Sequence, residues 1–151
     1  MWKLILAVLI AGLAVHDSAR GQVASADVNI VSVTRTVTAQ QFTCTAVINN
    51  QNDDDARDAR VIVLMPLQVR NVRGRVSGGP GRCTAGPSTG GYTAYATCYL
   101  GQLPQGPTVR RTVTVTSSPS TAGANYPPTC SAFIYSAVGD INKTNNYMVA
   151  P

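Results

Sequence analysis

Apolar and polar residues alternate along most of this chain, and this alternation limits its fold more than any other feature. In FTCTAVI (Phe42–Ile48) every second residue from Phe42 is apolar, and VRRTVTVT (Val109–Thr116) alternates as clearly. A period of two is typical of a β-strand with one buried face. The sequence predicts strands at Val28–Val37, Phe42–Ile48, Ala59–Met65, Leu67–Val76, Tyr92–Leu100, Val109–Thr116, Thr129–Val138 and Asn146–Ala150.

Composition supports an all-β chain. The 13 glycines and 9 prolines suit many turns, and glutamate, which helix surfaces use heavily, is absent. About seven or eight short strands in 151 residues predict one domain, an immunoglobulin-like β-sandwich with Greek-key connections. The Arg-rich run Leu67–Val76 is expected at a sheet edge. The core tryptophan of antibody domains is absent, because the single tryptophan is Trp2.

The N-terminus is typical of an export signal. Lys3 is followed by an apolar run of 12 residues, Leu4 to Val15, which is short for a membrane span and suits a signal-peptide core. Ala24-Ser25-Ala26 is a small-x-small motif, so residues 1–26 are predicted to be a signal peptide and residues 27–151 the domain. The alternative is a segment retained as an anchor. An exported protein would be periplasmic, surface-bound or extracellular.

The four cysteines are expected to form disulfides, because an even number in an exported chain favours bridges. Three pairings are open. Cys83 and Cys98 flank a loop rich in Gly, Pro and Ser, which favours a local bridge and leaves Cys44 with Cys130. In immunoglobulin strand order that second bridge crosses between the sheets. Metal binding is the alternative, but the chain has no Cys-x-x-Cys spacing.

Several segments together resemble a bacterial surface repeat, the domain-of-unknown-function family eleven, and more distantly the CARDB cell-adhesion domains. The matching segments, in chain order, are ADVNIVSV, FTCTAVINN, RVIVLMPLQVRNV, the Cys83/Cys98 pair, CYLGQLPQG, VRRTVTVT and GDINKTNNYMVA. They span about Ala26 to Ala150. The resemblance implies an immunoglobulin-like sandwich in an exported or surface protein, and it implies no catalytic residues.

Two loops are rich in oxygen-bearing side chains: residues 52–58, between the second and third predicted strands, and residues 140–146, before the last one. In immunoglobulin order they share one end of the sandwich, where carboxylate and amide oxygens could bind Ca²⁺. The alternative is that these side chains cap turns by hydrogen-bonding nearby backbone. The candidate calcium ligands are Asp53, Asp54, Asp55, Asp140 and Asn142.

A basic cluster and two tyrosines are the candidate ligand-binding residues. Arginine pairs well with phosphate, sulfate and carboxylate, so an anionic glycan or envelope polymer is a reasonable ligand. The alternative role for the arginines is protection of an edge strand. Tyrosines on one face of a strand can stack on sugars or anchor a protein, or they can pack under a loop. The candidates are Arg70, Arg73, Arg75, Arg82, Tyr95 and Tyr99.

Catalysis is disfavoured. The single histidine, His16, lies in the predicted signal, so the remaining chain has neither His nor Glu and no Gly-x-Ser-x-Gly elbow. We therefore predict no enzyme and no cofactor other than Ca²⁺. The predicted function is a structural or protein-interaction module of the envelope, through a protein partner or self-association. The alternative is an anionic-glycan-binding module. Neither nucleic acid nor a membrane span after the signal is expected.

Overall fold

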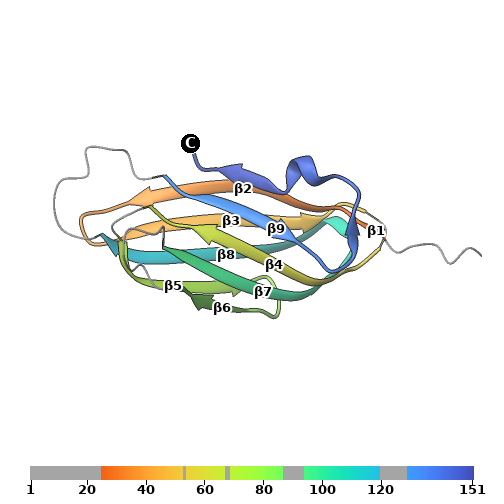
Figure 1. The fold of residues 1–151 in the computed structure, drawn as a ribbon, viewed down its shortest axis with the longest axis horizontal. Helices are drawn as coiled ribbons and strands as arrows, with labels where there is room; N and C mark the ends of the chain where they lie inside the picture. The colour runs from red at the N-terminus through yellow and green to blue at the C-terminus, as the bar shows by residue number, and fades with distance from the viewer. Residues whose placement is uncertain (1–24, 53, 67–68, 87–93, 120–128) are drawn as a thin grey trace, which may run out of the picture.

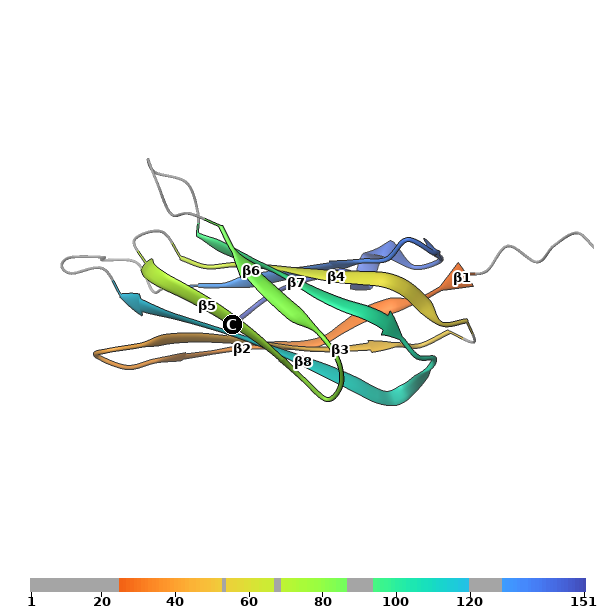
Figure 2. The same cartoon turned by 90° about the horizontal axis from the view of Figure 1, so that it is seen from below.

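Two antiparallel sheets pack face to face in the computed structural model, which describes residues 25–52, 54–66, 69–86, 94–119 and 129–151 (Figures 1 and 2). The β3 sheet has the order β2 (Val28–Val37), β3 (Phe42–Asn50), β8 (Gly106–Pro119), β5 (Val69–Ser77). The β4 sheet has the order β11 (Tyr147–Val149), β9 (Ser131–Tyr135), β4 (Ala56–Leu64), β7 (Tyr95–Leu103), β6 (Arg82–Ala85). The predicted β-sandwich is confirmed, and the Arg-rich strand β5 lies at an edge.

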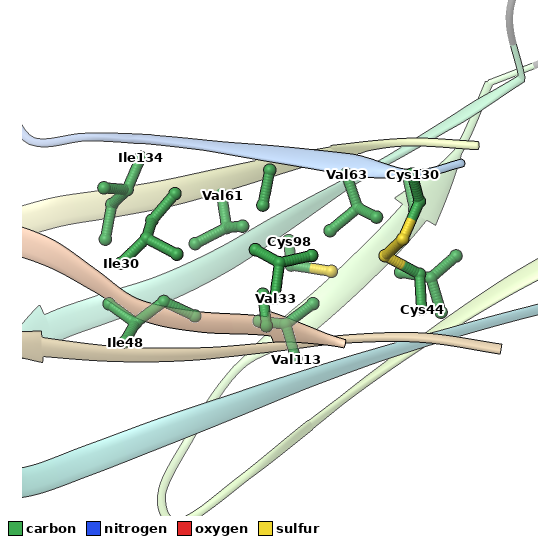
Figure 3. Packing of buried hydrophobic residues seen from close by; sticks show 14 of the residues in the cluster. Ile30, Val33, Cys44, Ile48, Val61, Val63, Cys98, Val113, Cys130 and Ile134 are labelled. Carbon is green, nitrogen blue, oxygen red and sulfur yellow. A yellow bond between two sulfur atoms is a disulfide. The ribbon is translucent and has the colours of Figure 1, made fainter. Parts of the chain in front are cut away.

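The core lies between the two sheets because alternate residues of each strand point inward. Ile48 and Val113 from the β3 sheet lie opposite Val61 and Val63 from the β4 sheet, and all four are fully buried (Figure 3). Burial of these apolar side chains is the main favourable term in folding. Phe42 is the one aromatic side chain of the core within the described residues.

Both predicted disulfides are present. Cys44–Cys130 joins β3 to the residue before β9 and so links the two sheets through the core (Figure 3). Cys83–Cys98 joins the neighbouring strands β6 and β7. In the chain-entropy treatment, the 15-residue separation is worth about 3 kcal/mol and the 86-residue one between about 4 and 5. Paired cysteines indicate an oxidising compartment.

The observed strands differ from the predicted ones where local geometry interrupts the alternation. β4 begins at Ala56, earlier than predicted, because its pairing with β7 continues to Ala56 beyond an irregularity. The register shifts on either side of Ala59, next to Asp58 with its positive φ of 49°, and this interrupts the alternation. β9 ends at Tyr135 instead of Val138, because Ser136 Oγ donates to the Val138 carbonyl in a turn. Residues 67–68 and 92–93 of the predicted strands lie outside the described residues.

Three strands and one turn were not predicted. β6 has four residues, and the paired β1 (Ser25–Ala26) and β10 (Gly139–Asp140) have two each. The 3₁₀ turn η1 (Lys143–Asn145) has three residues. None of these segments is long enough to show a period of its own.

Gly74 on β5 is required by a close approach between the two sheets. A Cβ atom at this position would lie 2.5 Å from Cys83 Cβ and 2.8 Å from Cys83 Sγ. The Cys83–Cys98 disulfide therefore packs directly on the Gly74 backbone. This contact also fixes the orientation of β5, because Gly74 faces the core.

We expect Gly74→Ala to lower the free energy of unfolding by about 1–3 kcal/mol, the usual effect of an added methyl group in a packed core. Urea denaturation measures the change. Gly139→Ala is the matched control, since a Cβ there meets nothing within 4 Å, and its stability should change little. Equal stabilities of the two variants would contradict the close approach.

Ser25 and Ala26 belong to the fold, although the predicted domain starts at Asp27. Ala26 is fully buried, and its carbonyl accepts from Ile141 N at 3.1 Å. Ser25 N donates to Asp54 Oδ2 at 2.9 Å, and Asn52 Nδ2 donates to the Ser25 carbonyl at 2.8 Å. The position of signal cleavage stays a prediction, but a chain without these residues loses β1.

We expect a chain that begins at Asp27 to be less stable than one that begins at Val23, by about 1–3 kcal/mol, because several net hydrogen bonds disappear with β1. Urea denaturation of the two purified chains tests this. Ser25→Ala in the longer chain keeps the backbone bonds and should lose less than about 1 kcal/mol. Identical stabilities of the two chains would show that β1 adds nothing.

Candidate functional site

The oxygen-rich loops meet at one end of the sandwich, as predicted, and their side chains bond to nearby protein groups. Asp55 Oδ1 accepts from Gln105 N at 2.9 Å, and Asp140 accepts from Asn142 N and Asn146 Nδ2, both at 2.9 Å. Asn142 Oδ1 accepts from Thr144 N at 3.3 Å. The Asp140 and Asn142 bonds stabilise their own turn, whereas the Asp54 and Asp55 bonds join their loop to β1 and to the turn between β7 and β8.

The calcium site stays a prediction. No group of three or more His, Cys, Asp or Glu residues that could hold a metal ion occurs within the described ranges. Asp53, one of the predicted ligands, lies outside them.

The predicted ligand-binding residues are divided between the two sheets. Arg70, Arg73 and Arg75 lie on β5 of the β3 sheet. Arg82 lies on β6 and the two tyrosines lie on β7, so these three belong to the β4 sheet. The sequence placed Arg82 with the other arginines, but the chain crosses from one sheet to the other between β5 and β6 (Figure 2).

The outer face of the β4 sheet gathers the aromatic residues. Directly paired residues share one face of a sheet, so the register gives its composition. Every aromatic residue that the structure describes, apart from Phe42, lies there. We call this surface the aromatic face; its residues are Tyr135, Arg60, Tyr99, Arg82, Tyr147, Phe133, Ile62, Thr97, Thr84, Val149, Ser131, Leu64 and Tyr95.

Tyr99 lies between two arginines. The guanidinium carbon of Arg60 is 4.9 Å from the centre of the Tyr99 ring, and that of Arg82 is 5.5 Å away. Cation–π attraction at these distances holds both positive charges against the ring. The row Tyr135, Arg60, Tyr99, Arg82 thus alternates rings and positive charges across four neighbouring strands, β9, β4, β7 and β6.

The other rings of the aromatic face remain partly open to solvent. Phe133 and Tyr147 stack with their centres 4.4 Å apart, yet Phe133 is 38% and Tyr147 is 49% exposed. Tyr95 is 39% exposed, and one side of its ring covers Gly86, where a Cβ would lie 2.2 Å from Tyr95 Cζ. Tyr95 therefore packs against a loop residue and remains partly exposed.

A shallow hollow of about 270 Å³ lies at one end of the aromatic face, where β11 and β9 meet β4. Ser131 is at the base of this end, since it is only 9% exposed although its register position is outward. The hollow is lined by Leu64, Met65, Pro66, Thr129, Cys130, Ser131, Tyr147 and Val149.

The outer face of the β3 sheet carries mainly hydroxyl groups and arginines and has no aromatic ring among its residues. Its register aligns Thr34, Thr45, Thr114 and Arg75 in one row across four strands, and the next row is Thr36, Thr43, Thr116 and Arg73. We call this surface the hydroxyl face; its residues are Ser32, Thr34, Thr36, Thr43, Thr45, Val47, Thr112, Thr114, Thr116, Ser118, Arg70, Arg73, Arg75 and Ser77.

Four aromatic or charged residues of the aromatic face were not among the sequence candidates: Arg60, Phe133, Tyr135 and Tyr147. Phe133 and Tyr135 carry a local signal, because they make the second side of their strand apolar where a solvent-facing strand is usually polar. Arg60 and Tyr147 carry no such signal. They join the site only through the pairing of β4 with β7 and β9, and of β11 with β9.

No protein-family model and no curated protein matches the chain. Among solved structures it is similar to a biomass-sensing module from an RsgI-like protein of Clostridium thermocellum, described as resembling a family 3 carbohydrate-binding module of the cellulosome. That likeness has 13% identity and a TM-score of 0.45, over 77% of this chain and 97% of the other.

A second similar structure is AvmM, which catalyses macrocyclization in alchivemycin A biosynthesis. It has 12% identity and a TM-score of 0.43, over 82% of this chain and 83% of the other. At these TM-scores neither likeness bears on function. No helix in the described part of the chain is long and apolar enough to cross a membrane.

Proposed function

We propose that this chain is a non-catalytic, exported domain that binds an anionic polysaccharide on the aromatic face. One observation carries the proposal: five aromatic rings and the guanidinium groups of Arg60 and Arg82 share one sheet face. The residues of that face include no carboxylate. Its location would be the periplasm, the cell surface or the extracellular space.

The chemistry of the face suits an acidic sugar polymer. The carbon-bound hydrogens of a pyranose form an apolar surface that packs on an aromatic ring. Tyrosine suits such a contact because its ring is apolar while its hydroxyl group can stay in water. Guanidinium groups form paired hydrogen bonds with carboxylate or sulfate. Thr97, between Tyr95 and Tyr99 on β7, and its pair Thr84 on β6 add hydroxyl groups that can bond to sugar hydroxyls.

A protein partner is the second candidate, and the exposed apolar side chains at the β11 edge favour it. Phe133 and Tyr147 are joined there by Val149, which is 45% exposed. Contiguous exposed apolar surface marks interaction sites. In that case the domain would be a structural or protein-interaction module, and light scattering of the pure protein would detect self-association through this edge.

We expect Arg60→Gln/Arg82→Gln to weaken binding to polygalacturonate at least tenfold. A hydrogen bond to a charged group contributes about 1.5–3 kcal/mol, and about 1.4 kcal/mol is tenfold in affinity. Isothermal titration calorimetry at low salt measures the change. Arg110→Gln/Lys143→Gln is the matched control, because it removes the same charge from exposed positions outside the aromatic face. Equal losses in both variants would indicate an effect of net charge alone.

We expect Tyr135→Ala/Tyr147→Ala to weaken the same binding at both low and high salt, since ring stacking is not screened by ions. The arginine contribution should instead fade as salt rises. Titrations at two salt concentrations separate the two effects, and thermal unfolding checks that the variant is folded. Undiminished binding by the tyrosine variant would overturn the aromatic face as the glycan site.

A further inference from the structure

Three arginines of β5 project from one side of an edge strand. Arg70 pairs with Ser118, Arg73 with Thr116 and Arg75 with Thr114, so their partners are evenly spaced on β8. Arg70 and Arg73 are three residues apart, which in a regular strand would place them on opposite faces. A bulge that contains Asn71, with a positive φ of 54°, restores the phase and returns both to the outer face.

The orientation of these arginines is fixed from inside the sandwich. Gly74 faces the Cys83–Cys98 disulfide, so its neighbours Arg73 and Arg75 face outward, and both are exposed. Among the residues that the structure describes, no side chain forms a hydrogen bond or ion pair with the guanidinium groups of Arg70, Arg73 or Arg75. The hydroxyl face includes no carboxylate, so three positive charges lie in a line without a counter-charge from that face.

Two shallow grooves run over this part of the hydroxyl face. One, of about 510 Å³, is lined by Arg73, Gly74, Arg75, Ser77, Thr114 and Thr116. The other, of about 530 Å³, is lined by Thr38, Gln40, Gln41, Asn71, Arg73, Thr116, Ser117 and Ser118. The grooves share Arg73 and Thr116, so they adjoin. Both grooves present guanidinium and hydroxyl groups, and the second adds side-chain amides, so their polar groups complement a hydroxylated anion.

We propose that the hydroxyl face with the β5 arginines is a second polyanion-binding surface, and that the domain cross-links two polymer chains. The outer faces of two packed sheets point in opposite directions (Figure 2). One polymer chain on each face is therefore sterically compatible with the other. This inference rests on the proposed function, since cross-linking requires the aromatic face to hold the first chain. Binding at two surfaces converts separate contacts into a network with higher avidity.

Titration calorimetry with a short oligogalacturonate tests the two surfaces separately. We expect the wild-type domain to bind two oligomers, and Arg73→Gln/Arg75→Gln to bind one. Arg60→Gln/Arg82→Gln should also bind one oligomer, because it loses the site on the aromatic face. Lys143→Gln, which removes an exposed charge that lies on neither face, should keep two, and thermal unfolding confirms that each variant is folded. A short polyphosphate, titrated in parallel, distinguishes a phosphate polymer from a carboxylate polysaccharide as the chemistry bound by β5.

Light scattering with long polygalacturonate tests the cross-linking itself. With wild-type protein we expect scattering to rise to a maximum at an intermediate protein-to-polymer ratio and then to fall, as a bivalent linker requires. Arg73→Gln/Arg75→Gln should bind the polymer without this maximum. One bound oligomer in the wild type, unchanged in the β5 variant, would overturn the inference and leave the proposed function standing. Loss of all binding in the aromatic-face variant only, with no effect at β5, would do the same.

If instead only the β5 variant lost binding, the aromatic face would be excluded and the proposed function would fail. Cross-linking would fail with it, while a single polyanion site on β5 would remain. The two failures are therefore distinguishable in the same set of titrations. A protein that sediments as an oligomer would be tested again at a concentration where it is monomeric, so that self-association does not imitate cross-linking.

Discussion

The packing of small and branched aliphatic side chains between the two sheets is the constraint on which the rest of this structure depends. Ala46, Ala96 and Ala132 are fully buried between the larger Val and Ile side chains, and Gly74 lies against a disulfide. Because these side chains are short, the two sheets pack closely. Among the described residues, the core between them holds one aromatic ring, that of Phe42. The other rings of the described chain lie outside, where packing of the core does not account for them.

Strand alternation then couples the core to the surface chemistry. On β5, Gly74 contacts the Cys83–Cys98 bridge while its neighbours Arg73 and Arg75 point to solvent. On β4, Val61 and Val63 fill the core while Arg60 contacts the ring of Tyr99. A change in register of one residue would exchange these roles, because the side-chain period is two. The disulfide between Cys44 and Cys130 links the two sheets covalently and so supports their packing against each other.

Much of the fold could be predicted from the sequence, since alternation is local and the cysteine spacing favoured one pairing. The candidate site could be predicted only in part, because its composition depends on which strands are neighbours. Nothing near Arg60 indicates that β7 brings Tyr99 beside it and β9 brings Tyr135. The bulges at Asp58 and Asn71 reverse the phase locally, so simple alternation misplaces residues beyond them. The resemblance to surface repeats stays a prediction, as does the absence of catalysis.

Protection of an edge strand is the other role open to the β5 arginines, and it makes a weaker demand on geometry. Charge anywhere along an edge discourages pairing with another chain. A bulge such as the one at Asn71 also protects an edge, but protection does not require that Arg70, Arg73 and Arg75 share one face. Asn71 is of a residue type that, after glycine, adopts this left-handed conformation most readily. The same three side chains can both block the edge and bind an anion, but only anion binding uses their alignment over the adjoining grooves.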